Sequence, residues 1–319
     1  MNGNPLLVLT APGDRNIPLL AELRQMATIV VGDSTQDFAR AAAEAETIFN
    51  WSASLTLLRD VFLISPCLRW IHSRSAGLEQ SLFPELVESE VILTNGSGVF
   101  SPSLGEFALA AILYFAKDFR RMIRNQMAGV WEQFDTTMVS GKTLGIVGYG
   151  SIGRAVAARA RALEMKVLAF RRSPGRDALV DHIYDTGQLL EMLSRCDYVV
   201  VTLPLTAQTR GLIAEREFAV MKRNAVLINI GRGPTIDEAV MVKALSENRI
   251  RGAALDVFDE EPLPSGHPFY SMENVLLSPH CADHTPEWLE DAMQFFLAQL
   301  ERFKRGEGLL NVVDKRLGY

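Results

Sequence analysis

Short apolar runs alternate with helix-length segments along almost the whole chain, and this pattern predicts the elements. The runs before residue 100 predict strands at Leu6–Thr10, Thr28–Val31, Thr47–Phe49, Trp70–Ser73 and Val91–Thr94. After residue 140, six more are predicted at Thr143–Val147, Lys166–Phe170, Tyr198–Thr202, Ala225–Ile230, Gly252–Val257 and Asn274–Ser278. Helical stretches such as Asp37–Ala45 and Thr56–Ser65 lie between strands. Strands alternating with helices at this spacing indicate parallel βαβ units, so we expect two doubly wound α/β domains.

A long helix is predicted to join the two series of strands. Ser103 and Glu106 have the spacing of a capping box at its start. Its last turns carry basic residues, which suit a helix C-terminus, at Lys117, Arg120, Arg121 and Arg124. An amphipathic helix at Pro286–Phe303 would return the chain to the first domain. We therefore expect a discontinuous first domain, residues 1–99 plus 287–319, and a second domain, residues 100–286.

Length and composition narrow the class of protein. A chain of 319 residues favours about two domains. The net charge of −6, without a long basic run, argues against nucleic acid or an anionic membrane surface as the main partner. No apolar window reaches the roughly 18 residues of a membrane span, and the N-terminus lacks a signal peptide's basic region. Three scattered cysteines (Cys67, Cys196 and Cys281) argue against disulfides or structural zinc and favour a cytoplasmic location.

A glycine-rich turn follows the first strand of the second series. Gly148, Gly150 and Gly153 stand between the strand at 143–147 and a helix-forming stretch, with Ser151 and Ile152 among them. Such a turn directs backbone N–H groups and the positive end of a helix dipole at one spot, which suits a diphosphate. The strand–turn–helix context predicts a dinucleotide site in the second domain.

The end of the next strand indicates which dinucleotide. In chains that prefer NAD, an acidic residue about 20 residues beyond the turn usually binds the ribose diol. Here Arg171, Arg172 and Ser173 occupy this place, and no carboxylate follows before Asp177. Guanidinium and hydroxyl groups suit a 2′-phosphate, which an acid would repel. We expect NADP(H) to be preferred, with NAD(H) possible.

Polar motifs follow three of the later strands, where an open α/β sheet places its ligand. They are Asn-Ile-Gly-Arg-Gly at 229–233, Asp-Val-Phe-Asp-Glu-Glu-Pro at 256–262 and Pro-His-Cys-Ala at 279–282. With the glycine turn, their order and spacing closely resemble the D-isomer-specific 2-hydroxyacid dehydrogenase family.

The resemblance implies a Rossmann cofactor domain, a flavodoxin-like substrate domain and an active site in the cleft between them. It implies Arg232, Glu261 and His280 as the catalytic residues. It also implies further cofactor-binding residues, namely Leu203, Pro204, Thr209, Ile230, Gly231 and Asp256, and a substrate-binding loop at Ser75, Ala76 and Gly77, where the backbone N–H groups of Ala76 and Gly77 would hold a carboxylate.

The chemistry of these side chains supports the same assignment. Reducing a 2-keto acid needs a hydride at carbon and a proton at oxygen, and histidine is suited to donate a proton near neutral pH. Glu261 would orient the protonated ring of His280. Arg232 would bind the substrate carboxylate and polarise the carbonyl. We expect an NADPH-dependent reductase of small 2-keto acids of the glyoxylate/hydroxypyruvate type, acting as a homodimer.

Two other functions stay open: a D-2-hydroxyacid dehydrogenase for bulkier keto acids, with NAD as a possible cofactor, and a dinucleotide-sensing binding protein or corepressor without turnover.

Arg74 would either add a cation to the pocket or face solvent, and Trp131 would close a pocket edge or anchor an interface. The remaining histidines, His72, His182, His267 and His284, are interpreted as packing or surface residues. His284 is also a candidate for the pocket of His280. These two histidines have the spacing of metal ligands, but no third ligand nearby completes a metal site.

Overall fold

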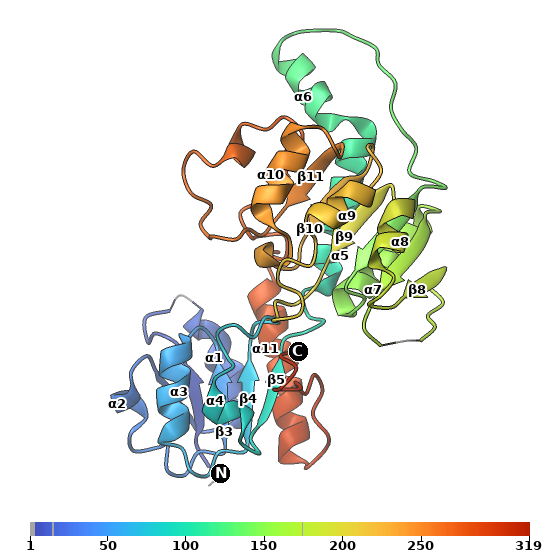
Figure 1. Cartoon of the computed structure of the whole chain (residues 1–319). Helices are drawn as coiled ribbons and strands as arrows, with labels where there is room; N and C mark the ends of the chain where they lie inside the picture. The colour runs from blue at the N-terminus through green and yellow to red at the C-terminus, as the bar shows by residue number, and fades with distance from the viewer. Residues whose placement is uncertain (1–3, 15, 174) are drawn as a thin grey trace. The chain divides into compact units, whose positions relative to one another are not determined.

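The computed structural model describes residues 4–14, 16–173 and 175–319. The chain divides into two compact units (Figure 1). Unit 1 runs up to Phe100 and resumes at Thr285, and unit 2 comprises Ser101–His284. Among the described residues, no helix is both long and apolar enough to span a membrane.

Unit 1 is built on a five-stranded parallel sheet of order β2-β1-β3-β4-β5. This is the flavodoxin-like order that the resemblance implies. The strands are β1 (Leu6–Leu9), β2 (Ile29–Gly32), β3 (Thr47–Asn50), β4 (Trp70–Ser73) and β5 (Ile92–Asn95). The helices are α1 (Leu20–Met26), α2 (Thr35–Phe38), α3 (Leu55–Leu63), α4 (Pro84–Val87) and α11 (Trp288–Lys304), with a short 3-10 helix, η1, at Ile17–Leu19.

Helices cover both faces of this sheet. Alternate side chains of each strand point to opposite sides, so each strand contributes to the apolar cluster on either face. Leu7 and Leu9 of β1 pack in a cluster with α2, α3 and α4. Leu6 and Val8 pack in a second cluster with α1 and α11, in which Phe296 of α11 is fully buried. The C-terminal helix therefore completes the hydrophobic core of unit 1.

Unit 2 carries a seven-stranded parallel sheet of order β12-β11-β10-β9-β6-β7-β8. The strands are β6 (Thr143–Val147), β7 (Lys166–Phe170), β8 (His182–Tyr184), β9 (Tyr198–Val201), β10 (Val226–Asn229), β11 (Gly252–Leu255) and β12 (Val275–Leu277). The expectation of six strands in this half was wrong, because β8 at the sheet edge was missed. With only three residues and an exposed histidine at its start, β8 gives no apolar run in the sequence.

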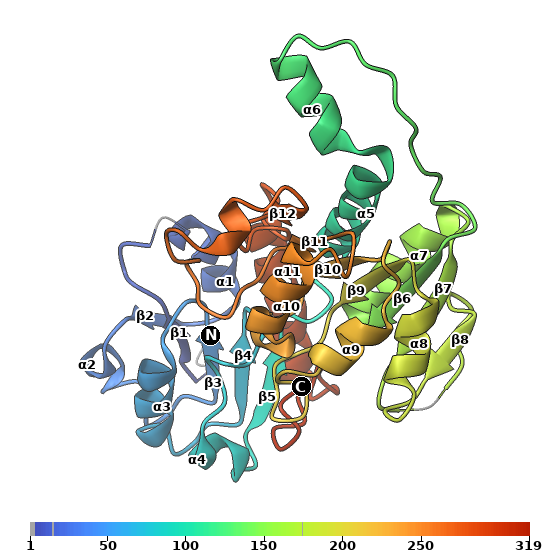
Figure 2. The ribbon, with the colours of Figure 1, turned by 45° about the horizontal axis from the view of Figure 1, so that its top comes forward.

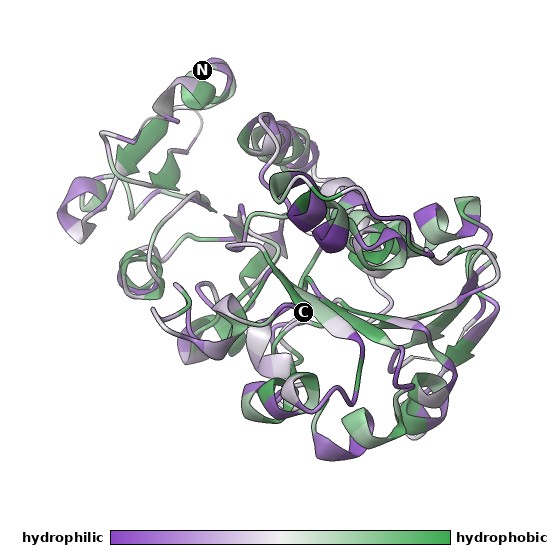
Figure 3. Ribbon diagram, turned by 90° about the horizontal axis from the view of Figure 1, so that it is seen from above, coloured by the Kyte–Doolittle hydropathy of each residue, from purple (hydrophilic) through white to green (hydrophobic). Residues whose placement is uncertain are grey.

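Helices cover both faces of the second sheet (Figure 2). A large apolar cluster joins one face to α8 (Leu189–Arg195), α9 (Glu215–Val220) and α10 (Glu238–Ser246). The helices α5 (Ser101–Lys117) and α7 (Ser151–Ala162) pack against each other and contact the strands β10 and β6, respectively. The strands are predominantly green in the hydropathy colouring, whereas the helices also carry purple, polar stretches (Figure 3). Two short 3-10 helices complete the unit, η2 (Gly233–Thr235) and η3 (Pro268–Tyr270).

The predicted joining helix is two helices. Asp118 adopts a left-handed conformation, with φ of 55°, which ends α5 and begins α6 (Phe119–Met127). The predicted capping box was also wrong, because α5 already begins at Ser101. Ser103 instead donates to the carbonyl of Ala282 at 2.7 Å, and Glu106 pairs with Arg159. Beyond α6, residues 128–142 form a long connection that extends from the body of unit 2 (Figures 1 and 2).

Candidate active site

The glycine turn lies at the switch point of the second sheet. The strand β6 lies between β7 and β9. The chain first continues from β6 to β7 and β8 on one side, and then crosses to β9 on the other side. Connections leave β6 and β9 in opposite directions at such a point, which opens a crevice at the carboxyl ends of the strands. The motifs at 229–233, 256–262 and 279–282 follow β10, β11 and β12, so they meet the glycine turn at the same edge of the sheet.

Each glycine of the turn has its own requirement. Gly148 has φ of +101°, a conformation that suits glycine. At Gly153 an added Cβ would lie 2.7 Å from the carbonyl oxygen of Gly148, so only glycine lets α7 approach β6 this closely. At Gly150 a Cβ would meet nothing within 4 Å. This open space lies at the N-terminus of α7, whose N-cap, Gly150, has no side chain to bond the first amides. The turn therefore fits a dinucleotide diphosphate.

The end of β7 presents basic rather than acidic groups. Arg171 is half-buried and its backbone N–H donates to Tyr184 at 3.1 Å, whereas Arg172 and Ser173 are exposed. The next carboxylate, Asp177, is paired with Arg154 of α7. That acid is therefore engaged with a guanidinium group, and the chemistry of the segment fits a 2′-phosphate.

Arg232 stands on a tightly held loop after β10. Its backbone carbonyl accepts from Asn229 Nδ2 at 3.1 Å and from Thr235 Oγ1 at 2.6 Å. A Cβ on Gly233 would lie 2.0 Å from the backbone of Phe258, so glycine is required there by packing. Asn229 and Thr235 were not among the predicted site residues. Asn229 could have been found from the sequence, because it is a polar residue at the end of an apolar strand.

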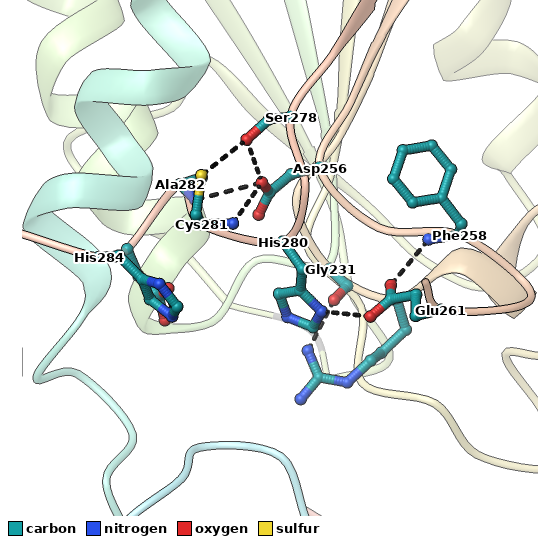
Figure 4. Close-up of polar contacts among 11 residues, drawn as sticks. Gly231, Asp256, Phe258, Glu261, Ser278, His280, Cys281, Ala282 and His284 are labelled. Carbon is teal, nitrogen blue, oxygen red and sulfur yellow. Dashed lines mark hydrogen bonds and ion pairs between the residues drawn. The ribbon is translucent and has the colours of Figure 1, made fainter. Parts of the chain in front are cut away.

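His280 and Glu261 form a direct pair (Figure 4). Nδ1 of His280 lies 2.6 Å from Oε2 of Glu261, and both side chains are partly exposed. The other carboxylate oxygen of Glu261 accepts from the backbone N–H of Phe258 at 2.9 Å. The backbone of His280 has φ of 50°, and its N–H donates to the carbonyl of Asp256 at 2.9 Å. The glutamate is thus fixed on one side and orients the imidazole on the other.

Asp256 organises the loop that carries this histidine (Figure 4). Its side chain is buried, and Oδ1 accepts from Ser278 Oγ at 2.6 Å and from the backbone N–H groups of Cys281 and Ala282 at 2.9 and 3.1 Å. Ser278 was not predicted as a site residue. A role of Asp256 toward a nicotinamide stays a prediction. Its hydrogen bonds hold the loop that carries His280 in place.

The remaining predicted cofactor residues lie on the segments that follow β9 and β10. Leu203 is close to Gly148 of the turn and to Gly231 after β10. Its backbone nitrogen would lie 3.0 Å from a Cβ on Gly148 and 2.9 Å from one on Gly231. Thr209 donates from its hydroxyl to the carbonyl of Pro204 at 2.6 Å, which closes the segment after β9. Ile230 is buried, and its N–H donates to Val201 at 3.1 Å.

In unit 1, the loop Ser75–Gly77 follows the carboxyl end of β4. Asn95 holds it by donating to the carbonyl of Ala76 at 2.7 Å. Arg74, immediately before the loop, is half-buried with its guanidinium carbon 4.9 Å from the ring centre of Trp51 and 5.2 Å from that of Trp288. Arg74 is therefore packed between two aromatic rings rather than extended into solvent.

The other histidines lie in different settings. His72 is fully buried in unit 1 and bonds Thr94 through Nδ1 at 2.7 Å, and burial lowers its pKa to about 3. His267 lies 3.2 Å from Glu238, and His182 is exposed on β8. His284 lies 3.7 Å from Asp283, its neighbour in the chain. Within the described ranges, no cluster of three or more His, Cys, Asp or Glu side chains could hold a metal ion.

Comparison with known proteins gives a consistent family. Residues 109–282 match the family model described as "D-isomer specific 2-hydroxyacid dehydrogenase, NAD binding domain". A glyoxylate reductase of Korarchaeum cryptofilum is 33% identical over 283 residues, 85% of each chain.

Two solved structures are similar along nearly the whole chain. One is an NADPH-dependent glyoxylate/hydroxypyruvate reductase from Sinorhizobium meliloti in complex with NADP and sulfate, with a TM-score of 0.86, 27% identity and coverage of 99% of this chain and 100% of that one. The other is a D-isomer specific 2-hydroxyacid dehydrogenase from Xanthobacter autotrophicus in complex with NADPH and MES, with a TM-score of 0.84, 28% identity and the same coverage. The match to the family model and the similarity to the Korarchaeum cryptofilum relative lead to one conclusion: the chain belongs to the D-isomer specific 2-hydroxyacid dehydrogenase family.

Proposed function

We propose that the protein reduces small 2-keto acids of the glyoxylate/hydroxypyruvate type to D-2-hydroxy acids, with NADPH as the preferred reductant. The observation that carries the proposal is the His280–Glu261 pair, held at the same sheet edge as a glycine turn that fits a dinucleotide. The names of the glyoxylate reductase relatives support the substrate class. When bound, a reduced nicotinamide supplies the hydride.

His280 supplies the proton in this proposal. Because Nδ1 faces Glu261, the nitrogen left to face a substrate oxygen is Nε2. The protonated ring donates from Nε2, and the neutral ring that remains keeps its Nδ1 proton in the bond to the carboxylate. Glu261 is a positioning group, since its own second oxygen is bonded to the backbone of Phe258.

Arg232 binds the anionic end of the substrate in this proposal. A guanidinium group donates paired hydrogen bonds to a carboxylate and stabilises charge that develops on a neighbouring carbonyl oxygen. The bonds from Asn229 and Thr235 to its backbone fix the start of its side chain. The loop Ser75–Gly77 is proposed as a second carboxylate-binding segment.

The preference for NADPH rests on the end of β7. Arg171, Arg172 and Ser173 are the proposed ligands of the 2′-phosphate, and Asp177 is engaged by Arg154. The NADP and NADPH complexes of the two solved relatives support this choice. The diphosphate is proposed to lie on the first amides of α7, at Ser151 and Ile152, over the space that Gly150 leaves open.

We propose a homodimer in the cytoplasm, with α6 and the connection after it covered by a second copy. This arm carries exposed apolar side chains, among them Met127 at 84%, Trp131 at 96% and Met138 at 70% exposure. Apolar side chains grouped on one projection indicate an interaction surface. A second copy of the chain would bury the same arm by two-fold symmetry.

The experiment that tests the activity is a panel of 2-keto acids of increasing size, followed by NADPH absorbance and repeated with NADH. We expect the highest kcat/KM for glyoxylate or hydroxypyruvate with NADPH. A maximum at a bulky keto acid with NADH would instead support the broader dehydrogenase. Tight NADPH binding with no turnover on any member of the panel would support a sensing protein.

A further inference from the structure

Tyr149, between the first two glycines of the turn, carries a hydroxyl that the proposed function has not used. Its residue is 6% exposed, and the hydroxyl oxygen is buried with no hydrogen-bond partner among the described residues. Buried polar groups in native proteins nearly always have a partner, protein or water. A phenylalanine would fill the same space without this unsatisfied group, so the hydroxyl points to a polar partner at this position.

Tyr149 lies where the start of α7 meets the end of β7, since the backbone N–H of its neighbour Gly148 donates to the carbonyl of Phe170 at 3.0 Å. The ring of Tyr149 is close to the helix start, since a Cβ on Gly153 would be 3.4 Å from Tyr149 Cδ2. The positive charges of Arg154 and Arg171 are near enough to act on the phenol, although burial is the larger effect and raises its pKa. The hydroxyl therefore stays protonated and can donate at neutral pH. The Arg154–Asp177 ion pair also ties the segment after β7 to the first turn of α7.

We propose that the Tyr149 hydroxyl donates a hydrogen bond to the 2′-phosphate of NADP(H), beside the guanidinium group of Arg171. The inference rests on the proposed cofactor. In a doubly wound fold the adenosine ribose lies at the end of the strand that follows the glycine turn, here β7. A hydroxyl that donates to a phosphate forms a charge-assisted bond, stronger than one to a neutral acceptor. Tyr149 is thus a specificity-determining residue within the turn itself.

Two reaction-free ligands separate this proposal from a structural role of the hydroxyl. Adenosine 2′,5′-bisphosphate and adenosine 5′-monophosphate differ only in the 2′-phosphate. Calorimetric titration of Tyr149→Phe should show Kd rising about tenfold for the bisphosphate and little change for the monophosphate. The matched control is Tyr198→Phe, which removes the hydroxyl of another buried tyrosine, the first residue of β9, at the amino-terminal ends of the strands. It should leave both Kd values unchanged.

Three results would overturn the assignment of Tyr149. The first is an unchanged Kd for the bisphosphate in Tyr149→Phe, and the second is an equal loss for both ligands. The third is a wild-type protein that does not distinguish the ligands, which would also remove the proposed NADPH preference, whereas the first two leave that preference intact. Phosphorus NMR gives a second readout, since only the 2′-phosphate resonance of the bound bisphosphate should shift between wild type and variant. Thermal unfolding followed by circular dichroism verifies that both variants are folded.

Discussion

At the scale of single residues, the pair of His280 and Glu261 carries the proposed chemistry. Glu261 contacts the imidazole at 2.6 Å and is itself bonded to the backbone of Phe258. We predict that Glu261→Gln lowers kcat about 100-fold while the Kd for NADPH stays within about twofold, because the ring loses its orienting charge but the cofactor site is untouched. Stopped-flow turnover and calorimetry measure the two quantities. Glu260→Gln, one residue earlier and exposed, should behave like wild type, and an equal effect of both variants would contradict the assignment.

His72 leads to a prediction on stability rather than activity. Burial lowers its pKa to about 3, against about 6.5 in the unfolded chain. Between about pH 3 and 6.5 the folded state therefore binds fewer protons at His72 than the unfolded chain does. The contribution of the neutral His72 side chain to the free energy of unfolding is complete above about pH 6.5 and falls as the pH drops toward 3. At about pH 4.5 the loss should reach about 2–3 kcal/mol.

Chemical denaturation at neutral pH and at about pH 4.5 tests this effect. His72→Gln is neutral at both values, so its free energy of unfolding should fall less with acidification than that of wild type. His182→Gln, which changes an exposed histidine, should follow wild type. Parallel acid profiles for wild type and His72→Gln would contradict the prediction.

At the scale of elements, the glycine turn separates stability from ligand binding. A Cβ on Gly153 would press on the carbonyl oxygen of Gly148, whereas one on Gly150 would enter open space at the start of α7. We predict that Gly153→Ala lowers the free energy of unfolding by about 1–3 kcal/mol through overpacking. Gly150→Ala should leave stability within about 0.5 kcal/mol but weaken NADPH at least tenfold, since its methyl group would occupy the phosphate space.

Thermal unfolding without ligand and calorimetry with NADPH measure the two effects. The expected pattern is a lower Tm only for Gly153→Ala and a raised Kd for Gly150→Ala without loss of Tm. Tight NADPH binding to Gly150→Ala would exclude the proposed diphosphate position.

The elements also show what the sequence could and could not predict. Buried parallel strands are continuous apolar runs, which is why runs such as Tyr198–Val201 predict a strand in the right place. The edge strand β8 has no such run, because it is only three residues long and begins with an exposed histidine. The break between α5 and α6 depends on the left-handed backbone of Asp118, in a stretch whose side-chain pattern continues to favour helix.

The site was predictable to a similar degree. Arg232, Glu261 and His280 stand in motifs, and the local sequence of each motif is enough to propose them. The contact of His280 with Glu261 follows from the sheet, since both loops leave neighbouring strands, β11 and β12. The packing of Arg74 between Trp51 and Trp288 could not be predicted, because these residues are far apart in the chain and meet only in the folded unit.

At the scale of the whole molecule, the exposed arm determines the predicted assembly. In light scattering coupled to gel filtration, the wild-type chain should have about twice the mass of 35.3 kDa. The double variant Met127→Asp with Trp131→Ala should shift toward the monomer, because it places charge and removes an aromatic anchor on the proposed interface. Leu63→Asp, an exposed apolar position on α3 of unit 1, should remain dimeric. A monomeric wild type would refute the proposed dimer.

The central claim is that this chain transfers a hydride from NADPH to a small 2-keto acid with His280 as the proton donor. Steady-state kinetics of wild type and His280→Asn with hydroxypyruvate and NADPH test it most directly, alongside NADPH titrations of both proteins. We predict turnover by wild type, a loss of at least 100-fold in kcat for His280→Asn, and an NADPH Kd that is unchanged within about twofold. Undiminished turnover by His280→Asn would contradict the account.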